Sequence, residues 1–289
     1  NGKDAAIKDI IKEEKIIKPS GLLDLTSLQR EANKLLGFSA QQTLDLAQGL
    51  YEKKVITYPR TDSKFLTEDM KDETKDLIIN LAKSKILGEN LSEKYKVEEI
   101  KIENVINNKK VSDHHAIIPT NEALKPDLSL TDSEEKILYL VMHKLLESVY
   151  KPIKQTNIQI DLVIEDEIFE FSGKQILDDG FKLVERGMKE KLNIEIEEHK
   201  TSFEGEVNIG QIFEKVELSS EDKKTQPPKY YTEATLLSAM ENVGRLVDDK
   251  ELKESLSKGL GTPATRAGII EQIIKKGFVK RDGKKLIAT

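Results

Sequence analysis

Apolar residues in the first half of the chain recur with the spacing of helices. Four of them fall at i, i+4, i+7 and i+8 and predict a helix from residue 27 that ends at Gly37: Leu28, Ala32, Leu35 and Leu36. Residues 39–42 match a capping box and predict a second helix. Thr67 is the expected cap of a third helix that runs toward residue 87, and Thr131 opens a fourth that ends near residue 150.

The pattern changes at residue 153, where apolar and polar residues begin to alternate. The alternation over 158–164 predicts a half-buried strand, and another strand begins at residue 168. Further strand-like pieces lie at 181–184, 192–196, 204–208 and 212–218. Together they predict an antiparallel sheet with acidic outer faces. The charged, Ile-rich segment 3–17 fits either a helix or a strand edge.

Residues 225–289 predict two helices followed by a basic hairpin. A polar linker at 225–233 leads into a helix at 233–243. Thr262 is a candidate N-cap, Pro263 suits the first helical position, and Gly277 ends the helix. Residues 278–287 predict a hairpin with an Asp282-Gly283 turn. This order of elements is winged-helix-like.

Length and composition restrict the class of protein. The chain has 289 residues, enough for two or three domains, and no Cys, which excludes disulfides and thiolate zinc sites. No apolar run approaches the roughly 20 residues that a membrane-spanning helix needs, so no membrane partner is expected. The chain starts at Asn1 without an initiator Met or a signal-peptide pattern. We therefore expect a piece of a longer protein.

Charge is distributed unevenly along the chain. The net charge is −6, but residues 223–289 hold 14 basic and 8 acidic residues, whereas residues 153–222 hold 8 and 18. A basic C-terminal module is compatible with a nucleic-acid partner. Lysine-rich helices that are merely solvated explain the same excess equally well.

The stretch 57–63 places a tyrosine two residues before an arginine, after a short β-branched run at 55–58 that predicts a brief strand. Pro59 fixes its own φ and pushes Tyr58 toward an extended conformation, so the loop can hold the Tyr58 phenol beside the Arg60 guanidinium. A phenolate can attack a phosphodiester, and an arginine can clamp the phosphate through two parallel hydrogen bonds. A plain strand end followed by a polar turn would show the same residues.

The adjacent pair His114 and His115 is the second candidate feature. A histidine here can hydrogen-bond a phosphate or tune a tyrosine, and the alternative is one core and one surface histidine. Further ligands at workable spacing are absent from the sequence, so no metal site is expected in this chain.

The third candidate is the helix start at 262–266. Gly261 lets the backbone come close to a ligand, and the free N–H groups of the first turn could seat a phosphate together with the side chains of Thr262, Thr265 and Arg266. The alternative is a plain capped helix. No Gly-rich phosphate loop of the Walker type is present, so ATP use is not expected.

Taken together, these motifs resemble the type IA DNA topoisomerases, most closely the bacterial topoisomerase III branch. The matching stretches are LTSLQREANKLLGFSAQQTLDLAQGLYEKKVITYPRTDS (25–63), SDHHAIIPT (112–120), PPKYYTEATLLSAMENVGR (227–245) and GLGTPATRAGIIEQIIKKGFV (259–279). Their order and rough spacing match the family. The proline after the tyrosine and the lack of cysteine zinc modules favour the topoisomerase III branch.

The resemblance implies roles for individual residues. Tyr58 would be the nucleophile that takes the 5′-phosphate of a cleaved single strand, and Arg60 would position that phosphate. His114 matches the first position of the family's His-x-Ala-Ile-x-Pro-Thr pattern and would be a second phosphate contact. His115 falls at a position that the family varies. The remaining matches imply DNA contacts by Ser27, Gln29, Thr265 and Arg266. Thr262, the cap of the same helix as Thr265, is a further candidate DNA contact.

The resemblance also implies what lies outside this sequence. The family's toprim domain precedes these motifs and supplies the acidic Mg²⁺ ligands, a catalytic glutamate and a lysine. We therefore expect an α+β multidomain internal fragment, part of the type IA toroid, with a helical tyrosine domain at 19–152 inserted in a β-rich arch and hinge formed by 1–18 and 153–222. Residues 223–289 would be an incomplete winged-helix-like base. The Mg²⁺ ligands would lie in the missing domain.

The expected activity is ATP-independent cleavage of single-stranded DNA through a phosphotyrosine, strand passage and resealing. The fragment alone would bind single-stranded DNA without cleaving it. We expect a monomer in the bacterial cytoplasm, associated with the nucleoid. The alternative is a non-enzymatic winged-helix DNA-binding module in which Tyr58 merely stacks on a base, and a structural interaction domain is a third possibility.

Overall fold

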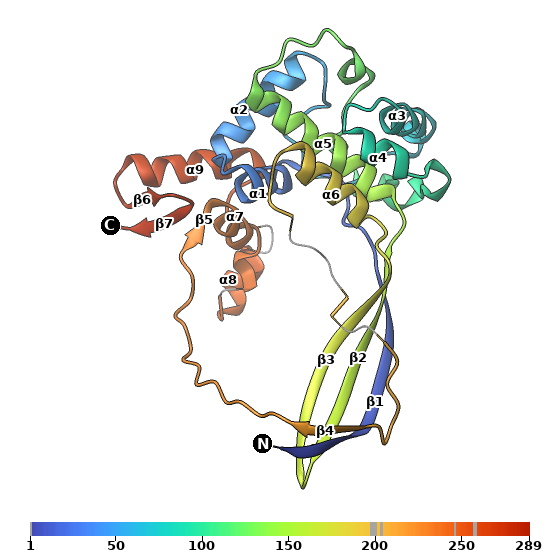
Figure 1. Cartoon of the computed structure of the whole chain (residues 1–289). Coiled ribbons are helices and arrows are strands. Elements are labelled where there is room, and N and C mark those ends of the chain that lie inside the picture. The colour runs from blue at the N-terminus through green and yellow to red at the C-terminus, as the bar shows by residue number, and fades with distance from the viewer. Residues whose placement is uncertain (1, 197–200, 203–204, 246, 257–258) are drawn as a thin grey trace. The chain divides into compact units, whose positions relative to one another are not determined.

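The computed structural model describes residues 2–196, 201–202, 205–245, 247–256 and 259–289 and combines helices with antiparallel sheets (Figure 1). The chain divides into two compact units. The first contains Asn1–Pro19, Lys151–Lys182 and Ile196–Pro228, and the second contains Ser20–Tyr150, Leu183–Glu195 and Lys229–Thr289. The sequence predicted three domains. In the structure, residues 229–289 belong to the same unit as the helical segment 20–150.

The first unit is a four-stranded antiparallel sheet in the order β3-β2-β1-β4. Its strands are β1 (Lys3–Ile17), β2 (Ile153–Ile164), β3 (Glu167–Asp178) and β4 (Ile212–Val216). The ambiguous segment 3–17 is therefore a strand, and it pairs with β2 from Ala6↔Val163 to Ile17↔Ile153. Ile7, Ile158 and Ile160 form a small buried cluster that holds β1 against β2.

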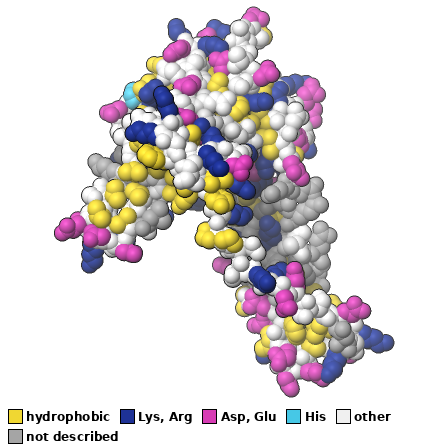
Figure 2. Space-filling view, turned by 90° about the vertical axis from the view of Figure 1, so that its left-hand side faces the viewer, with side chains coloured by type: hydrophobic (Ala, Val, Ile, Leu, Met, Phe, Trp, Pro, Cys, Tyr) yellow, Lys and Arg dark blue, Asp and Glu magenta, His cyan; other side chains and the backbone are white. Residues whose placement is uncertain are grey.

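The outer part of the sheet is less acidic than the sequence predicted. Every residue from Glu167 to Ser172 on β3 is exposed, and this run includes Ile168, Phe169 and Phe171. Figure 2 shows hydrophobic side chains interspersed with charged ones over the face that it presents. Because the side chains of both faces are exposed over this run, it shows no alternation of burial.

The strands predicted after β3 are partly wrong. Residues 181–184 open the helix α6 (Lys182–Lys191), in which Val184 and Met188 are buried at i and i+4. Residues 192–196 form no strand, and neither do residues 205–208, whereas 204 lies outside the described residues. The piece predicted at 212–218 is β4. Short apolar runs do not separate helix from strand by periodicity alone.

The second unit begins with helices, most of which were predicted: α1 (Leu25–Leu36), α2 (Ala40–Glu52), α3 (Lys71–Lys83) and α5 (Asp132–Val149). The short helix α4 (Glu89–Lys94) was not predicted. Single 3₁₀ turns lie at Glu68–Met70, Val97–Glu99, Ile102–Val105, Asn108–Lys110, Asn121–Leu124 and Val243–Arg245. Gly37 ends α1 in the left-handed region, and Thr131 makes the predicted capping box with Glu134. The helix predicted from Thr67 toward residue 87 instead begins with a 3₁₀ turn and ends at Lys83.

The C-terminal segment forms the predicted helices and hairpin. Its elements are β5 (Tyr231–Thr232), α7 (Glu233–Glu241), α8 (Lys250–Ser255), α9 (Pro263–Lys275), β6 (Val279–Asp282) and β7 (Lys285–Ala288), with sheet order β5-β7-β6. The hairpin turn is Gly283-Lys284 rather than Asp282-Gly283, because Asp282 already pairs with Lys285. Gly283 has a φ of 56°, which a glycine adopts without strain.

Buried polar contacts join α7 and the hairpin to α1 and α2. Glu233 is 4% exposed, and its carboxylate accepts hydrogen bonds from the backbone N of Ala40 at 2.7 Å and from Arg281 Nε at 2.8 Å. The Asn33 side chain accepts from the backbone N of Ala234 at 3.1 Å. An apolar cluster of α2, α7 and α9 lies beside these contacts and contains Ala40, Leu237, Met240, Ala267 and Ile270. These contacts fix α7 and α9 next to the helices that precede Tyr58.

We predict that Glu233→Gln lowers the free energy of unfolding by about 1–3 kcal/mol, because an amide can accept only one of the two hydrogen bonds and leaves a buried donor unpaired. Chemical denaturation followed by circular dichroism measures the loss. The exposed Glu251 of α8 supplies the control Glu251→Gln, which should unfold like the parent. Equal midpoints for both variants would contradict the role of Glu233.

We also predict that Gly180→Ala destabilises the sheet unit more than Gly210→Ala. Both glycines have positive φ, 51° and 84°, so either alanine costs about 1 kcal/mol of backbone strain. At Gly180 a Cβ would also overlap the Pro152 carbonyl and lie 2.6 Å from the backbone N of Ile153, whereas Gly210 has open space. Denaturant unfolding of both variants gives the difference, and equal losses would disprove the steric argument.

Candidate active site

Two segments far apart in sequence are paired through their backbones and position Tyr58. Thr57 N donates to Ile118 O at 3.0 Å, and Ile118 N donates to Thr57 Oγ1 at 3.0 Å. Thr120 N donates to Val55 O at 3.0 Å, and Ile56 makes an isolated bridge with Pro119. The strand predicted at 55–58 is therefore a single bridge. We call this contact the 55–58/116–120 pairing.

Small hydroxyl residues after Tyr58 hold its loop in place. Thr61 is 3% exposed, accepts from Leu25 N through its carbonyl at 3.1 Å, and donates from Oγ1 to His114 O at 3.1 Å. Ser63 is 4% exposed and donates from Oγ to Lys110 O at 2.9 Å. These side chains satisfy buried backbone groups and are not free to act on a ligand.

The Tyr58 ring contacts two other rings. Its centroid is 4.4 Å from that of His114, at an interplanar angle of 46°, and 5.4 Å from that of Tyr51, at 76°. The second contact is edge-to-face, a favourable geometry for aromatic pairs. Tyr58 is half-buried, and no hydrogen bond ties its hydroxyl to the part of the chain that the structure describes. Ring contacts thus hold the phenol in place, and its oxygen is available to react.

A cavity of about 230 Å³ brings the three predicted groups together. It is lined by residues of three segments: Arg60, Thr61 and Asp62; Ser112, Asp113 and His114; and Thr262, Pro263 and Ala264 at the start of α9. Arg60, His114 and Thr262 are all exposed. The arrangement offers a guanidinium, an imidazole and a helix N-terminus to one anionic group, which is a favourable environment for a phosphate.

The α9 N-terminus is built as predicted, except for its arginine. Thr262 and Thr265 form a reciprocal capping box, with Thr262 N donating to Thr265 Oγ1 at 2.9 Å. Arg266 is only 3% exposed and donates to Leu260 O at 3.2 Å and to Thr26 Oγ1 at 3.0 Å. In this structure Arg266 therefore fastens α9 to α1, and neither Thr265 nor Arg266 lines the cavity.

The other candidate residues lie apart from the cavity. Gln29 is fully buried, and its Nε2 donates to Ala40 O at 3.0 Å. His115 is half-buried, with Nδ1 2.8 Å from the oxygen of Ala116. Ser27 lines a different cavity, of about 660 Å³. The structure thus brings Arg60, His114 and Thr262 together at the cavity and separates the rest. Tyr58 does not line the cavity but packs its ring against His114.

Three residues at the site were not found from the sequence. Asp62 and Asp113 add two carboxylates to the cavity, and Tyr51 supports the Tyr58 ring from α2. Asp62 is part of the stretch 57–63 that contains Tyr58, but nothing in the sequence showed that Asp113 would line the same cavity. Tyr51 falls on the apolar face of α2, seven residues before Tyr58, and its spacing indicated only helix packing.

The donor set around Tyr58 falls short of what a divalent cation needs. Within the described ranges, no three side chains of His, Cys, Asp or Glu lie close enough together to hold a metal. Mg²⁺ is normally bound through carboxylates in near-octahedral geometry, with several waters retained. The residues present therefore do not make a complete site for this ion. Across the same described residues, the helices are too short or too polar to span a bilayer.

Comparison with known proteins identifies relatives over the whole chain. A family model described as DNA topoisomerase matches residues 1–289. DNA topoisomerase 3 of Bacillus licheniformis is 36% identical over 293 residues, which cover 100% of this chain and 40% of that protein. The Staphylococcus haemolyticus and Bacillus subtilis proteins of the same name are each 35% identical. The chain spans about 40% of the length of these curated relatives.

A solved structure supports the fold. Full-length topoisomerase I from Thermotoga maritima matches with a TM-score of 0.72 and 24% identity, over 99% of this chain and 43% of that one. At this identity the match concerns the fold alone. The family match over residues 1–289 and the relatives' identity confirm the resemblance that the four sequence motifs carried. The chain belongs to the DNA topoisomerase family.

Proposed function

We propose that this chain supplies the tyrosine half of the site at which an ATP-independent type IA DNA topoisomerase cleaves and reseals single-stranded DNA. The observation that carries the proposal is the convergence of Arg60, His114 and the α9 N-terminus on one cavity, with the Tyr58 ring packed against His114. The family match supports the reaction class. The half-site assignment, the substrate and the partners remain our proposal.

The chemistry follows from the groups at the cavity. Tyr58 Oη loses its proton and attacks the scissile phosphorus, a new P–O bond forms to the tyrosine, and the bond from phosphorus to the 3′ oxygen breaks. The leaving oxygen takes up a proton and becomes a free 3′-OH, while the 5′-phosphate stays on Tyr58. One phosphodiester replaces another, so attack by the 3′-OH reseals the strand without ATP.

Arg60 and His114 would stabilise the charge that builds on the phosphate oxygens. Both side chains are exposed to the cavity, and the Thr61–His114 hydrogen bond holds their loops at a fixed separation. Preorganised donors of this kind need little rearrangement as the charge develops. Thr262 and the first backbone N–H groups of α9 would contact the same strand.

The remaining parts of the proposal concern the longer protein. The family implies Mg²⁺, and we propose that its ligands and the acidic groups come from the toprim domain of the longer protein. We assign residues 19–152 to the tyrosine domain, 1–18 with 153–222 to the arch and hinge, and 223–289 to an incomplete winged-helix-like base of the toroid. We propose a bacterial, cytoplasmic and nucleoid-associated monomer.

Covalent trapping tests the proposal directly. We expect single-stranded DNA labelled at its 3′ end to remain attached to the protein after denaturation, provided that Mg²⁺ and a separately produced toprim domain are present. Tyr58→Phe should abolish the attached label, since the nucleophilic oxygen is gone. Label on the chain without the added domain would show that the half-site assignment is wrong. Label that persists in Tyr58→Phe would exclude Tyr58 as nucleophile.

Arg60→Ala should slow cleavage by the reconstituted enzyme about 100-fold, corresponding to roughly 3 kcal/mol of lost transition-state stabilisation, as for a single oxyanion donor. Single-turnover cleavage at saturating DNA measures this rate separately from binding. Lys54→Ala serves as the control, because Lys54 is an exposed cation in the turn after α2, near Arg60 in sequence, and does not line the cavity. An unchanged rate in Arg60→Ala would remove Arg60 from the mechanism.

A further inference from the structure

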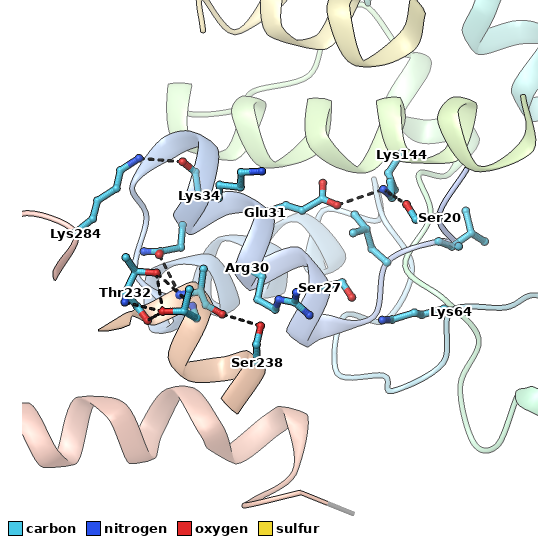
Figure 3. Close-up of a pocket in the computed structure, with 16 residues that line it drawn as sticks. Ser20, Ser27, Arg30, Glu31, Lys34, Lys64, Lys144, Thr232, Ser238 and Lys284 are labelled. Carbon is cyan, nitrogen blue, oxygen red and sulfur yellow. Dashed lines mark hydrogen bonds and ion pairs between the residues drawn. The ribbon is translucent and has the colours of Figure 1, made fainter. Parts of the chain in front are cut away.

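A third cavity lies in the sheet unit and differs from the other two in charge. The cavity beside Tyr58 presents Arg60 and His114, and Figure 3 shows basic side chains around the cavity of about 660 Å³. The third cavity has a volume of about 300 Å³, and we call it the Phe169 cavity. It is lined by four apolar residues and three charged ones, all in the first unit: Ile164, Phe169, Val216 and Leu218, with Lys3, Glu165 and Glu167.

The Phe169 cavity is the open end of the apolar face of the sheet. Figure 1 shows the start of β1, the turn between β2 and β3, and β4 together at one end of this sheet. Farther along the same face, Ile7, Ile158 and Ile160 are buried, and Val207 packs against them. At the cavity the Phe169 side chain is 39% exposed. The core of the unit thus ends in an apolar surface that the described residues leave partly uncovered.

β3 is the outermost strand of this sheet, and its outer edge is unpaired beside the cavity. Ser202 N donates to Lys174 O at 2.9 Å, and Lys174 N donates to Ser202 Oγ at 2.8 Å, so Lys174 turns both backbone groups away from β2. Because these groups alternate along a strand, Ile168 and Glu170 turn theirs to the same side. In the described part of the chain, no strand pairs with them there. An unpaired edge beside apolar side chains can accept a strand from another chain.

Four consecutive residues of β3 determine what such a strand must carry. Glu167 and Phe169 lie on the face of the cavity, whereas Ile168 and Glu170 lie on the other face. Residues directly opposite each other in two paired strands interact on the same face. The matching segment therefore needs a basic residue opposite each glutamate and an apolar residue opposite each of the two apolar side chains. Its pattern is basic-apolar-apolar-basic, which reads the same in either chain direction.

Charge decides between the possible occupants of this edge. Residues 155–173, which span the turn between β2 and β3, hold five acidic and no basic residues. Lys3 pairs with Glu165, but within the described ranges neither Glu167 nor Glu170 has an ion pair. A nucleic acid is repelled by such a surface. A second copy of β3 in antiparallel pairing would place Glu167 opposite Glu170, and like charges directly opposite are destabilising. A basic segment is attracted.

We infer that the outer edge of β3 and the Phe169 cavity form a docking site for an extended basic segment of a partner protein. The segment has the pattern basic-apolar-apolar-basic and joins the sheet as an added strand. Its apolar side chain opposite Phe169 extends the apolar face at the cavity, and its basic side chains pair with Glu167 and Glu170. This contact goes beyond the proposed DNA cleavage, because no residue of the Tyr58 site takes part in it.

Two labelled peptides of opposite charge test the pattern on the intact chain. We expect Thr-Thr-Lys-Val-Val-Lys-Thr-Thr to bind about tenfold more tightly than Thr-Thr-Glu-Val-Val-Glu-Thr-Thr, because two attractive cross-strand pairs replace two repulsive ones. Fluorescence anisotropy at low ionic strength measures both affinities. Glu167→Lys/Glu170→Lys should reverse the preference. Glu13→Lys/Glu14→Lys makes the same change of charge at exposed positions of β1 and should keep the preference of the parent.

The apolar contact has its own matched pair of variants. Phe169→Ser should weaken binding of the lysine peptide about tenfold, because the ring no longer buries apolar surface against the added strand. Ile11→Ser removes an exposed apolar side chain from β1 and should leave the affinity unchanged. Circular dichroism checks that the variants are folded.

Several results would overturn the docking site. These are equal affinities of the two peptides for the parent chain, a preference that survives Glu167→Lys/Glu170→Lys, and no binding of either peptide. Sedimentation velocity tests the other occupant, and we expect a monomer. A dimer of the parent chain that Phe169→Ser abolishes would show that a second copy occupies the edge, and the partner segment would be wrong.

Discussion

The 55–58/116–120 pairing is the constraint on which the candidate site depends. Two of its hydrogen bonds join backbone groups, Thr57 to Ile118 and Thr120 to Val55, and in a third Ile118 N donates to the Thr57 hydroxyl, so none of them uses the reactive side chains. Buried backbone groups must find partners, and here they find them in each other. The pairing carries Tyr58 and His114 into ring contact without either residue having to stabilise the loop.

Buried polar contacts are a second constraint on the structure, and they link the C-terminal segment to the helices. Glu233 and Arg266 are both almost fully buried, and each bonds to a residue about 200 positions or more away in sequence. Such groups are costly unless paired, and so they specify one docking of α7 and α9. Arg266 illustrates the consequence. Its guanidinium has the chemistry of a phosphate ligand, but here it is buried and joins α9 to α1 through Thr26. Thr262, at the exposed end of the same helix, is left to face the cavity.

The sequence correctly predicted those helix ends that are determined by neighbouring residues. The capping box at Thr131, the left-handed Gly37 and the Pro263 helix start are determined by neighbouring residues, and they were predicted correctly. The roles of Gln29 and Arg266 in packing are long-range, and no local pattern shows which polar residue will be enclosed. The segment at 181–184 was mistaken for a strand because its helical spacing continues only beyond it, at Met188.

The 55–58/116–120 pairing also has a consequence for how this protein can vary in length. More than fifty residues separate the paired segments, including α3, α4 and several 3₁₀ turns. The entropy of closing so long an excursion changes only slowly with its length, by about 0.6 kcal/mol for each doubling. Insertions or deletions within α3, α4 and the turns near them would thus leave the tyrosine and histidine in register, provided that the paired ends and the cavity segments 60–63 and 112–114 stay intact. That middle part of the excursion can change in length while the chemistry stays in place.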